Sequence, residues 1–364
     1  MIKPAPKNMD GALLTESINT DKALIYTDFQ GKESVFFERE GKLLFAFCKN
    51  DVMPVDTICI AKISEIKEDI NAAFLLLGDK QKCFIHTDEL SKAANLSREN
   101  SGFKCGDNVL IRISKEPSKG KLASAKAVSD EKLIAEAKTR TDFSVLRGGE
   151  DYIGKSLRMA EEISKSYGDS GKIRVLTDNP QTFDILSESI SGFASASTIA
   201  AGMEVVFSAS EILFTTPKLY QDSLVSLKVL YGIESKLKEA LGRKVWLRSG
   251  AYITVEPTEA MTVIDVNTAK SSARKSEEDH YLAVNAEAAD EIMRQILLRN
   301  LSGIIIIDYI NMKNDADRKE IIQIMSNHPL NYGKNMNISG FTKLGLLEIS
   351  RRKTGRSLTE IFSL

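Results

Sequence analysis

Two aspartates, each at the end of an apolar stretch, are the residues of this sequence best suited to catalysis. Asp265 and Asn267 end the run AMTVIDVN (260–267), and Asp308 ends the isoleucine-rich part of GIIIIDYI (303–310). Runs rich in Val and Ile are typical of buried strands. Because side chains alternate along a strand, we expect Asp265 and Asn267 on one face, opposite the apolar residues beside them.

The segment between the two runs would bring the aspartates together. Residues 280–300 have helical spacing and are long enough for a right-handed crossover, so the two strands are expected to be parallel and adjacent. Asp265 and Asp308 then emerge at the same edge of the sheet, where open α/β sheets bind ligands. The alternative, that each aspartate merely ends its strand and caps the next turn, stays open.

Two converging carboxylates repel each other unless a cation compensates for their charge. Mg²⁺ typically binds one or two carboxylates together with water and substrate phosphate. Asn267 adds a neutral group that can orient a carboxylate or a water molecule. The pattern therefore predicts a metal-assisted reaction on a phosphate ester.

Composition gives a broad frame for this chemistry. With 43% hydrophobic and 27% charged residues the chain is typical of a globular protein. Its longest apolar run, 303–307, is too short to span a membrane, and no signal peptide is evident, so we expect a cytoplasmic protein. The four cysteines form no C-x-x-C pair, which favours reduced, buried thiols. A net charge of −1 is unusual for a dedicated nucleic-acid binder, but basic residues gather at 104–172 and around 351–356.

Periodicity divides the chain into two parts. Short strands with turns at Gly78 and Gly106 predict a small antiparallel barrel. After a helix at 150–167 the chain alternates between strands and helices, which indicates an α/β region. The expected elements there include a strand at 173–177, a helix opened by Asn179-Pro180, a strand at 204–208, an amphipathic helix at 219–241 and a hairpin turning at Ser249-Gly250.

Four segments, in the same order, resemble the ribonuclease E/G family. They are 256–267 (EPTEAMTVIDVN), 285–292 (NAEAADEI), 303–312 (GIIIIDYINM) and 345–351 (GLLEISR). The resemblance implies that Asp265 and Asp308 bind Mg²⁺, with Mn²⁺ as an alternative. It also implies that Asn267 belongs to the catalytic set and that Arg351 contacts RNA phosphate.

A weaker resemblance covers the barrel. Ala72-Ala73-Phe74 and Cys83-Phe84-Ile85-His86 look like the family's OB-type RNA-binding barrel, in which exposed aromatic residues stack on bases. Lys115, Lys119 and Lys121 look like its phosphate-contacting strand end. Phe74 and Phe84 could instead be core residues of the barrel.

The resemblance implies an α+β and α/β multidomain fold. In it an OB-type barrel is inserted in an RNase H-like subdomain, and a DNase I-like catalytic α/β subdomain follows. The expected boundaries are 1–54 with 172–250 for the RNase H-like subdomain, 55–126 for the barrel, 127–171 for a reduced helical linker or sensor segment, and 251–364 for the catalytic subdomain.

The sequence departs from the family in three ways. The segment between the barrel and Asn179 is short and lacks the motifs of a 5′-monophosphate pocket, which argues against 5′-end sensing. The C-P-x-C zinc motif does not follow Arg351, so we expect no zinc and no zinc-linked assembly; a homodimer through other surfaces is left open. Asn311 stands where the family usually has a further acid, which would weaken metal binding.

The resulting hypothesis is a Mg²⁺-dependent endoribonuclease for single-stranded RNA, in rRNA or mRNA processing or decay, that leaves 5′-phosphate and 3′-hydroxyl ends. One alternative is a non-catalytic RNA-binding protein that retains the family's fold. A second is a metal-dependent phosphohydrolase that acts on small phosphate esters. A histidine acid–base pair would leave cyclic phosphates instead, but the three histidines show no evident pairing in the sequence.

Overall fold

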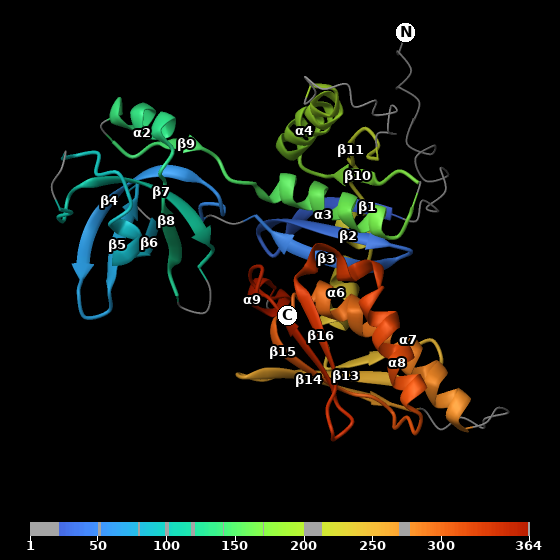
Figure 1. The fold of residues 1–364 in the computed structure, drawn as a ribbon. Coiled ribbons are helices and arrows are strands. Elements are labelled where there is room, and N and C mark those ends of the chain that lie inside the picture. Colours follow the sequence, from blue (N-terminus) through green and yellow to red (C-terminus); the bar gives the residue numbers. More distant parts are fainter. Residues whose placement is uncertain are drawn as a thin grey trace, which may run out of the picture. The chain divides into compact units, whose positions relative to one another are not determined.

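The structure is a computed structural model, shown as a ribbon in Figure 1. The structure describes residues 22–49, 52–78, 81–98, 102–117, 121–140, 142–169, 171–199, 213–268 and 277–362. These residues form two compact units. The smaller runs from Cys48 to Leu157 with Thr354–Ile361; the larger includes the chain before it and the stretch from Arg158 to Lys353.

A closed barrel makes up most of the smaller unit. Its strands are β4 (Ile58–Lys67), β5 (Ala72–Leu77), β6 (Gln81–His86), β7 (Asn108–Lys115) and β8 (Ala123–Ala127). The strands pair in the order β5-β6-β8-β7-β4, and β4 also pairs with β5, which closes the ring. β6 and β8 are parallel, and helix α1 (Thr87–Leu90) lies between β6 and β7 in the chain. The predicted small barrel is confirmed, but it is not wholly antiparallel as expected, because β6 and β8 are parallel. Its topology is compatible with an OB-type barrel.

The barrel interior holds apolar side chains and two of the cysteines. Cys59 and Cys83 are fully buried there, and burial raises the pKa of both thiols to about 12, so both stay protonated. Cys48 is also buried, and all four thiols are free. The expectation of buried thiols is wrong for Cys105, which is exposed. The rest of this unit contains helix α2 (Glu131–Lys138) and strand β9 (Val145–Arg147), which pairs with β4.

The first sheet of the larger unit is mixed. Its order is β11-β10-β1-β2-β3, where β1 pairs antiparallel with β2 and parallel with β10. The strands are β1 (Lys22–Phe29), β2 (Lys32–Arg39), β3 (Lys42–Cys48), β10 (Arg174–Thr177) and β11 (Lys218–Leu219). Helices α3 (Tyr152–Ser166) and α4 (Pro180–Ile199) flank β10 in the chain (Figure 1). The likeness of this part to RNase H stays a prediction.

Local signals explain the helices around this sheet. Asn179 accepts hydrogen bonds from the backbone N–H groups of Gln181 and Thr182 at 2.9 and 3.2 Å, which caps α4 as its sequence predicts. The single helix expected at 219–241 is wrong. Two shorter helices, α5 (Leu227–Leu230) and α6 (Ile233–Leu241), are separated by Gly232, whose φ of 59° belongs to the left-handed region and breaks the helical path. The strand expected at 204–208 lies outside the described residues.

A second sheet carries the predicted chemistry. Its order is β12-β13-β14-β15-β17-β16, and its strands are β12 (Lys244–Trp246), β13 (Tyr252–Pro257), β14 (Met261–Asn267), β15 (Gly303–Asp308), β16 (Met336–Phe341) and β17 (Leu347–Arg351). α7 (Glu277–Leu298) connects β14 to β15, and α8 (Asp315–Ser326) with the 3₁₀ helix Pro329–Lys334 connects β15 to β16. A short helix, α9 (Leu358–Ile361), ends the described chain. The likeness of this part to DNase I stays a prediction.

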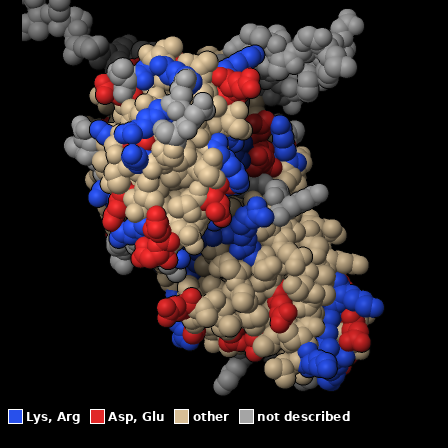
Figure 2. Space-filling model, turned by 60° about the vertical axis from the view of Figure 1, so that its left-hand side comes forward, with Lys and Arg blue, Asp and Glu red and all other residues tan. Residues whose placement is uncertain are grey.

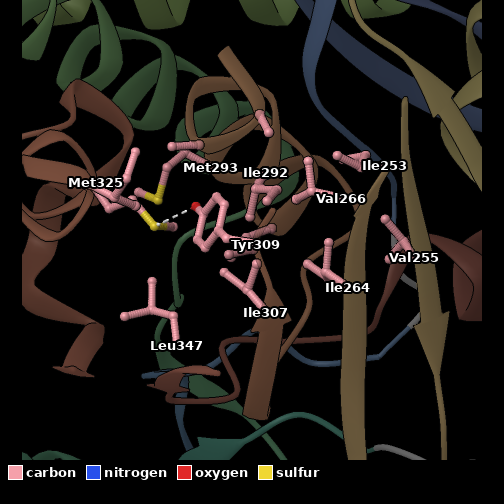
Figure 3. Packing of buried hydrophobic residues seen from close by; sticks show 14 of the residues in the cluster. Ile253, Val255, Ile264, Val266, Ile292, Met293, Ile307, Tyr309, Met325 and Leu347 are labelled. Carbon is pink, nitrogen blue, oxygen red and sulfur yellow. Dashed lines mark hydrogen bonds between the residues drawn. The ribbon is translucent and has the colours of Figure 1, made fainter. Parts of the chain in front are cut away.

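The core of this sheet lies between one of its faces and the helices α7 and α8. Ile264 and Val266 from β14 and Ile307 from β15 meet Ile292 and Met293 from α7 (Figure 3). Strand residues that alternate with these buried ones must therefore lie on the outer face of the sheet. Among the described residues, no helix has both the length and the hydropathy needed to cross a membrane.

Candidate active site

Asp265 and Asp308 are direct partners across neighbouring strands. β14 and β15 pair in parallel from Met261↔Ile304 to Asp265↔Asp308, so the predicted parallel pairing is confirmed. Neighbouring strands lie about 4.8 Å apart, which places the two backbones one strand spacing from each other. Both aspartates alternate with core residues, and both reach the outer face, where Asp265 is half-buried and Asp308 is exposed.

Asn267 holds one of the carboxylates in place. Its Nδ2 donates a hydrogen bond of 2.6 Å to Oδ2 of Asp265, two positions earlier on the same face of β14. The bond restricts the rotation of the Asp265 carboxylate and does not involve its Oδ1. The sequence placed these two residues on one face, and the structure adds the contact.

Two residues that the sequence reasoning left without a role fix the chain directly after Asp308. Asn285 of α7 is fully buried; its Nδ2 donates to the carbonyl of Ile310 at 2.8 Å, and its Oδ1 accepts from the Ile310 N–H at 3.0 Å. Tyr309 is buried, and its hydroxyl donates to the Met325 sulfur at 3.1 Å (Figure 3). Burial raises the pKa of Tyr309, so the ring stays neutral. A buried asparagine inside the apolar face of a helix was the available signal for the first of these anchors.

The outer face suits a hard cation that keeps water ligands. Asp265 and Asp308 supply two carboxylates, and Asn267 can add an amide oxygen, which is the ligand type that Mg²⁺ prefers. The described ranges contain no group of three or more His, Cys, Asp or Glu side chains that could together hold a metal ion. The pair therefore fits an open site completed by water and phosphate, and does not fit a closed protein cage.

The barrel places its two predicted aromatic residues on its outside. Phe74 and Phe84 are direct cross-strand partners on β5 and β6, both half-buried, and neither belongs to the barrel core. The alternative that they are core residues is therefore wrong. His86 packs edge-on against Phe84 at 5.5 Å between ring centres, and Lys67 lies 5.7 Å from the Phe74 ring centre.

One of the predicted lysines continues this aromatic row. Strand register runs from Phe74 to Phe84 on β6, then to Ser124 on β8, and then, at an irregularity of the β7–β8 pairing, to Lys115 on β7. Lys115 and Lys121 are both exposed. Lys119 lies outside the described residues. A row of rings that ends in a cation is the arrangement with which single-stranded nucleic acids are held on barrels of this type.

Charge on the surface is mixed. Figure 2 shows Lys and Arg side chains interspersed with Asp and Glu side chains, with broad uncharged areas between them. The face drawn there therefore carries charges of both signs.

Comparison with known proteins shows which family the chain belongs to. The sequence model of the ribonuclease E/G family matches residues 136–354, more than half of the chain. The chain belongs to the ribonuclease E/G family. The matched stretch contains Asp265, Asn267 and Asp308 and the whole of their sheet.

Individual ribonucleases match shorter stretches of the chain than the family model does. Ribonuclease G of Salmonella typhimurium (strain SL1344) is 32% identical over 206 residues, which are 56% of this chain and 38% of that protein. Ribonuclease G of Haemophilus influenzae is 39% identical over 132 residues, 36% of this chain and 27% of that protein. Ribonuclease E of Synechocystis sp. is 39% identical over 139 residues, 38% of this chain and 21% of that protein. The chain thus spans well under half the length of these ribonucleases.

Arg351, which the resemblance to ribonuclease E/G proteins assigned to RNA, is not brought to the acidic pair. It pairs with Gly303 at the start of β15, whereas Asp308 ends that strand. Its Nη1 donates to Asn300 Oδ1 at 2.8 Å and to the Leu301 carbonyl at 2.7 Å. These bonds give Arg351 a structural role in the turn after α7, and its contact with RNA stays a prediction.

Proposed function

We propose that this ribonuclease E/G family member is a Mg²⁺-dependent endoribonuclease that cuts single-stranded RNA, in processing or decay, and leaves 5′-phosphate and 3′-hydroxyl ends. The observation that carries the proposal is the direct pairing of Asp265 with Asp308 on the outer face of the β14–β15 sheet. Family membership adds support, because curated relatives are named ribonuclease G and ribonuclease E.

In this proposal the residues have separate tasks. Asp265 and Asp308 hold the cation, Asn267 fixes the rotation of Asp265, and Asn285 with Tyr309 keeps the Asp308 turn attached to the core. A bound Mg²⁺ would supply charge neutralisation at the scissile phosphate and a water of lowered pKa. The product ends follow from attack of water on phosphorus with loss of the 3′-oxygen, which takes up a proton.

The barrel would hold the single strand. Phe74 and Phe84 offer half-buried rings on the outside of the barrel for base stacking, and Lys115 with Lys119 and Lys121 offers charge for phosphates. A phosphohydrolase for small esters would leave these aromatic and basic residues of the barrel unexplained. A histidine mechanism is disfavoured at His328, since its Nδ1 accepts from the Leu330 N–H and its Nε2 bonds Asp290.

The test is incubation of the chain with an AU-rich single-stranded oligonucleotide in Mg²⁺ and, separately, in EDTA. Cleavage in Mg²⁺ alone, with 5′-phosphate products, is expected. Binding without cleavage in either Mg²⁺ or Mn²⁺ would instead support the non-catalytic RNA-binding alternative. Asn311→Asp would then be the first variant to test for recovery of cleavage. Cyclic phosphate products would rule out the proposed chemistry.

A further inference from the structure

Three side chains form a cation–aromatic cluster at the edge of the second sheet, which also carries Asp265 and Asp308. Lys244 and Trp246 come from β12, and Tyr252 comes from β13. The Lys244 Nζ lies 3.8 Å from the Trp246 ring centre and 3.5 Å from the Tyr252 ring centre. The two rings meet edge to face, with 5.3 Å between their centres and an angle of 61°.

Strand register places this cluster beside the acidic pair. Trp246 pairs with Tyr252, and Tyr252 pairs with Asn267. One step along the strands, Lys244 pairs with Thr254, which pairs with Asp265. Cross-strand partners share a face, so the cluster lies on the same outer face as the aspartates. Its strands are one and two strand spacings of about 4.8 Å from the strand of Asp265, and one spacing more from that of Asp308.

The inward residues of these strands confirm the side on which the cluster lies. Val245, Ile253 and Val266 are buried in the core under the sheet (Figure 3 labels the latter two). Trp246 and Tyr252 alternate with them and therefore point the other way. All these residues belong to one compact unit and one continuous sheet, so their spacing does not depend on how the two units are arranged.

Trp246 presents a large aromatic ring to solvent. It is the single tryptophan of the chain, and 62% of it meets solvent. Lysine alone can be explained as protection of an exposed edge strand. That explanation does not account for a large aromatic ring on the same open face as the two carboxylates, two strands from Asp265. An exposed ring with a neighbouring cation is the chemistry that stacks a nucleobase and binds its phosphate.

We propose that Trp246, Tyr252 and Lys244 form a nucleotide-binding subsite that holds the RNA strand next to the phosphate being cut. The base of that nucleotide stacks on Trp246, and Lys244 turns from the rings to the adjoining phosphate. Tyr252 supports both side chains from the next strand. The inference rests on the proposed ribonuclease function and adds a second contact region to the barrel row.

The single tryptophan provides a direct measurement. The chain is titrated in EDTA with a short oligouridylate, so that binding is observed without cleavage, and Trp246 fluorescence is recorded. An abasic oligomer of the same length, which keeps the ribose–phosphate backbone, is the matched ligand. We expect the fluorescence to change at saturation with the oligouridylate and to change far less with the abasic oligomer.

Substitutions separate a subsite from a structural cluster. Trp246→Ala should raise KM for cleavage roughly fivefold or more, the effect of losing one base stack, with a smaller change in kcat. Trp246→Phe should restore most of this loss because it keeps a ring. Val229→Ala, at an apolar residue of α5 that is 65% exposed, is the control and should leave KM unchanged. Thermal melting of each variant checks that the fold is intact.

The outcomes distinguish this inference from the proposed function. Cleavage that proceeds with unchanged KM in a folded Trp246→Ala variant, and without a fluorescence change on binding, overturns the subsite and leaves the nuclease. A base-dependent fluorescence change in a chain that cuts no RNA supports the subsite while the nuclease proposal fails. Equal fluorescence changes with abasic and base-bearing oligomers overturn the stacking role.

Discussion

The Nδ2 of Asn267 lies 2.6 Å from Oδ2 of Asp265, and both side chains occupy the outer face of β14. This bond joins a residue that cannot carry charge to one that can. Because Asp265 also pairs in register with Asp308, the three residues form a small polar group in which only the two aspartates supply negative charge. The first two predictions separate these contributions.

Removing either negative charge should remove the cation. Asp265→Asn and Asp308→Asn keep the shape of the side chain, and each is expected to abolish Mg²⁺-dependent cleavage while RNA binding is largely kept. Stability should not fall, since loss of one carboxylate relieves repulsion in the metal-free protein. Cleavage assays, RNA-binding titrations and thermal melts measure the three effects. Asp315→Asn, at a carboxylate of α8 with 85% of its side chain exposed, is the control. Full activity in either site variant would contradict the metal assignment.

Removing the orienting bond should matter less. Asn267→Ala leaves both carboxylates and frees the rotation of Asp265, so we expect a reduced kcat that is still well above that of the aspartate variants. A Mg²⁺ titration of activity is the measurement, and it should show a shift to higher Mg²⁺ concentration. If Asn267→Ala is as inactive as Asp265→Asn, the asparagine is itself a required ligand.

The shortened middle segment predicts insensitivity to the 5′ end. One RNA sequence is prepared with a 5′-monophosphate and with a 5′-hydroxyl, and the initial cleavage rates are compared. Similar rates are expected, because the motifs of a monophosphate pocket are missing between the barrel and Asn179. A strong preference for the monophosphate would reveal a sensor built from other residues.

RNA binding should depend on both charge and stacking in the barrel. Replacing Lys115, Lys119 and Lys121 with Gln should weaken binding and lower the slope of log Kd against log salt by about 0.7 for each phosphate that is no longer neutralised. Phe74→Leu and Phe84→Leu should each cost about 1–3 kcal/mol of binding free energy and leave the salt slope unchanged. Fluorescence anisotropy at several salt concentrations measures both. A salt slope unaffected by the lysine changes would count against this RNA path.

A partly buried ion pair between β2 and the segment that follows α3 predicts a pH dependence of stability. Arg39 donates to both oxygens of Asp169 at 3.0 and 3.3 Å, and these bonds hold the pKa of Asp169 below its usual value. A carboxylate with a lowered folded pKa stabilises above its unfolded pKa of about 3.9 and loses this contribution as the pH falls through the folded value.

The matching variant is Asp169→Asn. At neutral pH its free energy of unfolding should be lower by about 1.5–3 kcal/mol, the range for hydrogen bonds to a charged group. The difference from wild type should shrink as the solution is acidified below about pH 4. Glu234→Gln, in an exposed pair with Lys238, is the control and should change stability little. Denaturant unfolding across the pH range tests this, and a constant difference would contradict it.

The sequence by itself determined the local features of the site. Period-two alternation is a property of a single strand, so Asp265 and Asn267 could be placed on one face before any partner strand was known. The length of the helix between the two strands is also local, and it sufficed to predict their parallel order. The barrel, the Asn179 cap and the hairpin at Ser249-Gly250 followed in the same way from turn and strand signals.

The tertiary structure decided what depends on register and on distant partners. No local pattern specifies that Asp265 lies opposite Asp308, because that pairing depends on how the strands pack against α7. The pairing of Arg351 with Asn300 and Leu301 joins residues about fifty positions apart, and the single helix expected at 219–241 is broken at Gly232. Lys244, Trp246 and Tyr252 are spread over two strands, and only the β12–β13 register brings the cation between the rings. Sequence periodicity does not specify such contacts, because it describes one strand at a time and not the register between two.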